Sequence, residues 1–501
     1  MRSLEVEHKR RPRRRRTLHH GSGASHHSMG FYGSFLFLSN LITGPGMLGL
    51  PAAFAQGGWL QAGSCTLLFA TASTLMCAFI AHACRIYRSE KLRAVSMPGA
   101  YERSLDHEPH VELETLVRAV TPPSLWLAFQ LAFYGAMMLM AISCVVISAA
   151  SLDQLSVLLL GDAWALQLTP RLAVVSSCSG TLACASQPLF AATASAGGYI
   201  VSAGYAFVVV ITLPLALIEV SDAFQAASYA VSSICLLLLM CKFVALAASA
   251  PVAAPLHPMG WDSGLVSEVC FWSWCISFAV PMWLDEKYEG LSIERPLFAA
   301  FGHRALLDLL LGVSGAAAFP SLPASKLNIL DAVASHPSCG TPIRACGILF
   351  VIASLLPNIT DYAMVASRNL ESHIGHSAAN AAGIVFPFLV GWMFYLGAAF
   401  STLINVSSPL LNGLVQFVVP SLLFSAYERL DEVNHPPHSL LTGRTVSVLG
   451  ISAAVSTWRR VALGIAAGSA SLIAFTYVFN GSGPAILRAT ASASDYSAQD
   501  R

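Results

Sequence analysis

The residues with the greatest chemical potential lie inside a long apolar segment, residues 31–55. From Ser39 to Pro51 this segment contains three glycines and two prolines. Proline lacks an amide hydrogen and glycine adds backbone freedom, so the sequence predicts a broken helix here. Lipid cannot satisfy the freed backbone groups, so such a break must face protein or water. An inert kink is the alternative, because glycine and proline also occur in ordinary membrane helices.

The predicted break could bind a molecule with two opposite charges. Unwinding would expose the ends of two half-helices, at Thr43, Gly44, Pro45, Gly46 and Met47. The amide end carries a partial positive charge suited to a carboxylate. The carbonyl end suits an ammonium group or a sodium ion. Together the two ends predict a receptor for a zwitterion, as in transporters with discontinuous helices.

A second interruption is predicted in the sixth apolar segment, residues 264–284. Small polar and aromatic residues meet there at Ser273, Trp274 and Ser277, ahead of Pro281. Broken segments at corresponding positions of two repeats indicate a transporter site. The first and sixth segments correspond in a five-plus-five inverted repeat. Packing is the alternative role for these side chains.

Three polar residues inside apolar segments are candidates for coupling to an ion: Asn40, Ser354 and Asp361. Asn40 can donate or accept a hydrogen bond one turn ahead of the break, although an interhelical bond is its alternative role. Asp361 could relay a proton, or it could pair with Arg368. The Ser354 hydroxyl could hold a cation or simply pack. Asp308 is a further intramembrane charge without an assigned role.

The composition predicts an all-α polytopic membrane protein. Of 501 residues, 55% are hydrophobic and 11% are charged, against about a quarter charged in soluble proteins. Eleven segments are apolar enough to cross a membrane. They are residues 31–55, 59–86, 123–150, 196–218, 224–249, 264–284, 302–320, 342–364, 381–403, 405–425 and 461–480.

The ends of the chain differ in charge. Residues 1–30 include an arginine run and predict a disordered basic arm in the cytosol, able to touch anionic lipid. Residues 31–480 form the predicted membrane domain, and 481–501 a short non-cytosolic tail. A multi-pass chain disfavours a nucleic-acid partner, and the paired histidines of the arm fit a polar tail better than a metal site.

Three cysteines fall in loops that this topology places outside: Cys178, Cys184 and Cys339. An outer or lumenal face permits disulfides. One of the first two could bridge to Cys339, and the sequence leaves open which one. The region 151–195, which contains Cys178 and Cys184, is predicted as a long outer loop.

The first segment resembles the signature of the amino acid/auxin permease family, with its asparagine, Gly-x-Gly and Leu-Pro between Asn40 and Pro51. Further stretches are similar to family segments in the same order, over about residues 31–480. These stretches are Val111–Val117, Leu213–Leu215, Leu396–Ala398 and Val419–Leu422.

The resemblance implies a LeuT-like inverted-repeat fold with broken first and sixth helices. It also implies secondary active transport of amino acids, with small neutral ones expected, in symport with sodium or protons. The backbone of Thr43–Met47 would bind the amino acid. Asn40 matches the asparagine linked to sodium binding, but no threonine is in register near Ser354, so both ions stay open.

Some proton-coupled members of this family have a disulfide between outer loops, and Cys178 or Cys184 with Cys339 would fit it. An amino-acid sensor that signals without transport is the alternative function. No enzyme is expected, because the chain has no compact catalytic motif. No cofactor or metal is expected either. The predicted location is a plasma membrane or a lysosomal or vacuolar membrane, with a cytosolic N-terminus.

Overall fold

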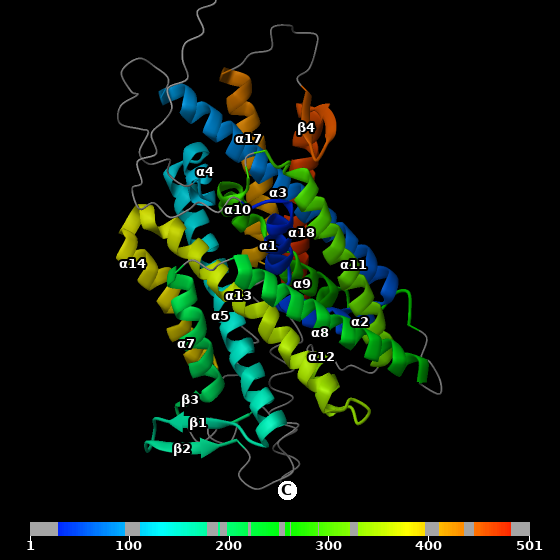
Figure 1. Cartoon of the computed structure of the whole chain (residues 1–501). Coiled ribbons are helices and arrows are strands. Elements are labelled where there is room, and N and C mark those ends of the chain that lie inside the picture. The colour runs from blue at the N-terminus through cyan, green and yellow to red at the C-terminus, as the bar shows by residue number, and fades with distance from the viewer. Residues whose placement is uncertain are drawn as a thin grey trace, which may run out of the picture.

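A computed structural model describes most of the chain as one helical bundle (Figure 1). The described residues are 29–95, 111–177, 189–190, 198–218, 222–249, 256–260, 262–288, 290–320, 329–395, 410–434 and 445–481. The predictions of a disordered arm and of a C-terminal tail concern residues that lie almost wholly outside these ranges.

The first span is broken as the sequence predicts. Helix α1 (Phe31–Ile42) is followed by the 3-10 turn η1 (Pro45–Gly49) and by α2 (Leu50–Gly57). The two halves are bent by 56°. Proline stands in the first turn of both η1 and α2, where its missing amide costs nothing.

The next elements lead from one end of the bundle to the other and back. They are α3 (Trp59–Val95), α4 (Leu113–Val120), α5 (Pro123–Leu160), strands β1 (Trp164–Gln167), β2 (Ala173–Ser176) and β3 (Ile200–Ser202), and helices α7 (Ala203–Ile218) and α8 (Asp222–Ser249). The strands form an antiparallel sheet in the order β2-β1-β3. The predicted loop at 151–195 is wrong at its start. Its apolar residues continue α5 to Leu160, and Gly161 ends the helix in a left-handed conformation.

The sixth span is also interrupted. It consists of α9 (Ser263–Ser273), the short 3-10 turn η3 (Ser277–Ala279) and α10 (Val280–Glu286). Pro281 lies in the first turn of α10, so it starts the second half-helix rather than causing the break. Asp262 caps α9 by accepting a bond from the amide of Leu265 at 2.9 Å.

The second half of the bundle contains the remaining helices and a short hairpin. They are α11 (Glu294–Ala318), α12 (Ile329–Ser335), α13 (Thr341–Ile374), α14 (His376–Asn380), η4 (Ala381–Val385), α15 (Phe386–Phe394), η5 (Leu414–Val418), α17 (Val419–Asn434), strands β4 (Thr445–Val448) and β5 (Ile451–Ala454), and α18 (Val455–Gly481). The elements η4 and η5 are π-helical.

By length and hydropathy, eight helices among the described residues can cross a membrane, or nine if the bent first pair is one span. The other two of the eleven predicted spans correspond to α7, a shorter apolar helix, and to α18. The predicted all-helical membrane fold is confirmed, with a three-stranded sheet at one end of the bundle and a two-stranded hairpin at the other. Helix α13 lies at its centre and packs against α5, α7 and α8.

Figure 1 shows the sheet β1–β3 at one end of the bundle and α4, β4 and the end of α17 at the other. The predicted topology places this second end in the cytosol, and we call it the inner end.

Candidate functional site

The break in the first span is held by its own backbone. The amide of Thr43 bonds the carbonyls of Asn40 and Ser39, and the Thr43 hydroxyl donates to the Ser39 carbonyl at 2.7 Å. The Gly44 amide then donates to the Ile42 carbonyl at 2.8 Å, which turns the chain out of the helix. Helix α1 therefore ends at buried residues, Leu41 and Ile42, with a carbonyl end that α2 does not continue.

The break in the sixth span is stabilised by two neighbouring helices. Ser73 on α3 donates its hydroxyl to the Trp274 carbonyl at 2.8 Å. On the other side, the amides of Ile276 and Ser277 both donate to Oε1 of Gln416 in η5, at 2.7 and 2.6 Å. Backbone groups freed by the break are thus satisfied by protein, as a membrane interior requires.

The structure brings the two breaks into direct contact. A Cβ atom added at Gly46 would lie 2.7 Å from the Ser273 hydroxyl oxygen and 2.8 Å from the Ser273 amide nitrogen. Real Cβ atoms do not approach other atoms so closely, so only glycine fits. The first break therefore meets the sixth at Gly46 and Ser273, and a Cβ atom at Gly44 would lie 3.7 Å from the Trp272 carbonyl oxygen.

The three predicted side chains of the sixth span have different roles. The ring of Trp274 is fully buried and stacks on Phe301 of α11, so its ring belongs to the packing. The Ser277 hydroxyl donates to the Val415 carbonyl at 3.2 Å. The Ser273 hydroxyl and the Trp274 Nε1 atom are buried and have no hydrogen-bond partner among the described residues, which leaves both groups available to a ligand.

A buried chain of polar groups runs from α1 through α8 to α13. Asn40 donates to the Gln225 carbonyl at 2.9 Å, and the Gln225 side chain donates to Asp361 at 3.3 Å. In addition, Asn358 donates to the Thr43 carbonyl at 2.9 Å and so satisfies the end of α1. Two of the predicted ion-coupling residues, Asn40 and Asp361, are therefore linked through one intermediate residue.

Ser354, the third predicted coupling residue, does not bond to this chain of polar groups. Its hydroxyl donates to the Val351 carbonyl of its own helix at 3.1 Å. The sequence also suggested that Asp361 pairs with Arg368, and here the structure differs. Asp361 accepts its bond from Gln225, whereas Arg368 is paired with Glu286 at 3.6 Å.

Sequence reasoning missed three residues at the breaks: Gln225, Asn358 and Gln416. Gln225 and Asn358 are the only amide side chains in their predicted spans, and this scarcity was the available signal. The span that contains Gln416 also contains Asn405 and Asn412, so there the sequence offered no such signal. Asn358 also belongs to a glycosylation motif, yet it is fully buried in α13. All three act on backbone or side-chain groups of other helices, which the sequence cannot place.

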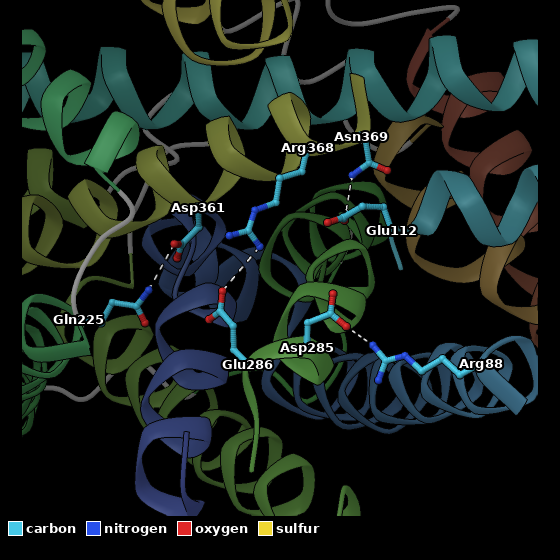
Figure 2. A network of polar contacts seen from close by, with 8 residues as sticks. All are labelled: Arg88, Glu112, Gln225, Asp285, Glu286, Asp361, Arg368 and Asn369. Carbon is cyan, nitrogen blue, oxygen red and sulfur yellow. Dashed lines mark hydrogen bonds and ion pairs between the residues drawn. The ribbon is translucent and has the colours of Figure 1, made fainter. Parts of the chain in front are cut away.

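Charged residues at the inner end hold α10 from two sides (Figure 2). Arg88 of α3 pairs with Asp285, and Arg368 of α13 pairs with Glu286. The backbone of Met29, just ahead of α1, bonds Glu286 and Tyr288 at 2.7 and 2.9 Å. We call these contacts the inner latch, because they join the second half-helix of span six to the start of span one and to α3 and α13.

Figure 2 also shows Asn369, which links the latch region to α4. Its side chain donates to Glu112 at 3.3 Å and accepts a bond from the amide of Glu114 at 3.1 Å. Glu114 in turn contacts His373 at 2.9 Å. Segment 111–117, selected from sequence as an acidic family stretch, thus docks α4 on the end of α13.

Removing one charge of the inner latch should loosen it. For Arg88→Gln we expect amide hydrogen exchange in α10 to accelerate about two- to fivefold, because partly exposed ion pairs contribute about 0.2–1 kcal/mol. Hydrogen exchange with mass spectrometry measures this. The matched control is Arg459→Gln, which removes a pair with Glu432 elsewhere at the inner end. Equal acceleration of α10 in both variants would contradict a specific latch.

Cys178 and Cys184, the predicted partners of a disulfide with Cys339, lie outside the described residues. Cys339 is buried at the turn before α13. Burial raises the pKa of the Cys339 thiol, which disfavours the reactive thiolate. Among the described residues, no group of three or more metal-ligating side chains could hold a metal ion.

No protein-family model matches the chain, and no curated protein matches it. The resemblance to the amino acid/auxin permease family therefore stays a prediction. Solved structures do match. MhsT in complex with L-phenylalanine is 13% identical, with a TM-score of 0.60 over 90% of this chain and 99% of that one. A manganese transporter of Eremococcus coleocola is 11% identical, with a TM-score of 0.46 over 89% of this chain and 94% of that one.

The likeness to MhsT covers 90% of this chain. At such low identity it shows the fold and leaves the substrate open. The chain is a multi-pass membrane protein of the LeuT-like fold, with its first and sixth spans broken and in contact.

Proposed function

We propose that this protein is a secondary active transporter that carries small neutral amino acids by alternating access, in symport with sodium or protons. The observation that carries the proposal is the contact between the two broken spans at Gly46 and Ser273. Half-helix ends at bilayer depth attract both charges of a zwitterion. The likeness to MhsT, crystallised with L-phenylalanine, supports an amino acid as the substrate class.

Alternating access needs a part that can open at one end while the site closes at the other. The inner latch joins the start of α1 to α10 through backbone bonds, and it joins α3 and α13 to α10 through ion pairs; water can replace these contacts at the inner end. Release of these contacts would free both half-helices together. A bound substrate can bias this step only if it contacts the two states differently.

Uptake in proteoliposomes tests the proposal. The purified protein is reconstituted and given a panel of radiolabelled neutral amino acids, including L-phenylalanine, under a sodium or a proton gradient. We expect gradient-driven accumulation of at least one of them. Replacing sodium by choline separates the two ions. Binding without accumulation would favour the sensor instead, and neither binding nor uptake across the panel would refute the proposal.

Between the two coupling ions, the buried carboxyl of Asp361 favours a proton. One of its oxygens accepts a bond from Gln225, and the other has no hydrogen-bond partner in the described part of the chain. Arg368 and Glu286 also act on Asp361 electrostatically. A carboxyl that gained a proton here would change the charge balance beside the inner latch.

For Asp361→Asn we expect acid stimulation of uptake to disappear, because asparagine can still accept from Gln225 but cannot carry a proton. The measurement compares initial uptake rates at acidic and neutral external pH. Glu371→Gln, at the exposed end of the same helix, is the control. Acid stimulation that persists in Asp361→Asn would exclude this carboxyl as the proton carrier.

A further inference from the structure

One buried side chain joins the sixth-span break to a different helix. Gln416 lies in the π-helical turn η5 and is fully buried. Its Oε1 atom accepts bonds from the consecutive amides of Ile276 and Ser277, at 2.7 and 2.6 Å. The neighbouring Val415 carbonyl accepts from the Ser277 hydroxyl. The π-helical turn thus presents two adjacent acceptors to η3, and π-helical turns recur at functional sites.

The other half of the Gln416 amide has a different environment. Its Nε2 atom is buried and has no hydrogen-bond partner in the part of the chain that the structure describes. A carboxamide nitrogen is only a donor, so it needs an acceptor. An unmatched buried donor of this kind costs about 1–3 kcal/mol. If Gln416 served only to accept bonds from two amides, its buried donor group would destabilise the fold without any compensating interaction.

The position of Gln416 connects it to the first-span break. Helix α5 packs against both η1 and η5, and η5 packs against η3. The first break meets the sixth at Gly46 and Ser273, four residues before Ser277. Ser273 carries the buried hydroxyl that also lacks a partner among the described residues. The Ser273 hydroxyl and the Gln416 Nε2 atom are therefore two buried donors without a described partner beside the sixth-span break.

We propose that Gln416 is a specificity-determining residue for the substrate carboxylate. Its Oε1 holds the break of the sixth span in shape, and its Nε2 donates to a carboxylate oxygen. This inference rests on the proposed amino-acid transport. It adds that the carboxylate is recognised by a side chain of η5, in addition to the half-helix ends of the first span. A ligand that lacks a carboxylate should gain nothing from Gln416.

The test separates the two halves of the amide. Gln416→Glu keeps the acceptor for Ile276 and Ser277 but replaces the donor with a negatively charged oxygen. Gln416→Met removes donor and acceptor at similar length. Ligand affinity is measured with purified protein for an amino acid that the wild type binds and for the amine formed by removing its carboxyl group. Thermal unfolding of each variant is recorded in parallel.

We expect Gln416→Glu to unfold at a lower temperature, because a buried charge without a counter-charge is costly, and to bind the amino acid at least about tenfold more weakly, as loss of a hydrogen bond to a charged group predicts. Binding of the amine should not weaken. Gln416→Met should show a similar loss for the amino acid and a lower unfolding temperature. It also provides the affinity measurement if Gln416→Glu does not fold. The control is Gln61→Glu, the same change at the outer end of α3.

Three results would overturn the inference. One is wild-type affinity of Gln416→Glu for the amino acid, and another is an equal loss for the amino acid and the amine. The third is wild-type affinity of Gln416→Met. If the wild type binds no amino acid at all, the proposed function fails first, and this result is distinct because it precedes any variant.

Discussion

Replacing Gly46 by valine is expected to reduce uptake by about 100-fold or more while leaving the protein inserted in the membrane. The added Cβ would lie within 2.8 Å of the Ser273 amide nitrogen and of the Trp272 Cβ. A backbone atom cannot move aside as a flexible side chain can, so the two breaks must separate. Displacement of about 1 Å in a binding site is enough for a loss of this size.

The measurement is initial uptake in proteoliposomes, with the amount of inserted protein determined on the same vesicles. Gly302→Val is the matched control, because a Cβ at Gly302 on α11 would meet no atom within 4 Å. The control should retain uptake. Near-normal uptake by correctly inserted Gly46→Val would show that contact between the breaks is not needed for transport.

Among the substitutions proposed for this protein, Asp308→Asn is expected to lower the free energy of unfolding the most. Asp308 and Arg304 lie one turn apart on α11, are 0% and 2% exposed, and pair at 2.6 Å between Nε and Oδ1. The helix packs against α1, α2, α3 and α8, so neither charge can reach water. Asp308→Asn leaves the guanidinium without its counter-charge, which typically costs about 3–5 kcal/mol.

The double variant Arg304→Met/Asp308→Leu should recover most of this stability, because buried ion pairs can be replaced by well-packed apolar residues at little cost. Thermal unfolding in detergent of Arg304→Met, of Asp308→Leu and of the double variant gives the coupling energy. The surface pair Glu432–Arg459 provides a control, since Glu432→Gln should cost less than about 1 kcal/mol. Additive losses in the α11 variants would mean that the pair does not act as a unit.

The breaks were predictable because they depend on local backbone chemistry. Proline has no amide hydrogen to donate, and glycine leaves the backbone free, whatever residues surround them. The segment Gly44–Pro51 therefore interrupts the helix of the first span. The sixth break was a weaker prediction, made from Ser273–Ser277 and from Pro281. The structure places Pro281 at the start of α10, where it follows the break. The true cause includes contacts from Ser73 and Gln416, which lie far away in sequence.

The partners of buried polar groups were not predictable. Asp361 was expected to pair with Arg368, seven residues later on the same helix, since spacing along a helix is the only geometry a sequence provides. In the structure its partner is Gln225 on α8, and Arg368 turns to Glu286 on α10. These choices depend on how α8, α10 and α13 pack together.

Many membrane crossings and a first span that cannot be a continuous helix were both predictable from the amino acids alone. Both follow from local properties, namely apolar composition and the backbone chemistry of glycine and proline. Three features depend instead on how the helices pack: the two breaks touch, Gln416 accepts hydrogen bonds at the second break, and Asn358 donates to the end of the first half-helix. In a low-dielectric interior each freed backbone group must find a partner. Which residue supplies it depends on distances between helices that are remote in the chain.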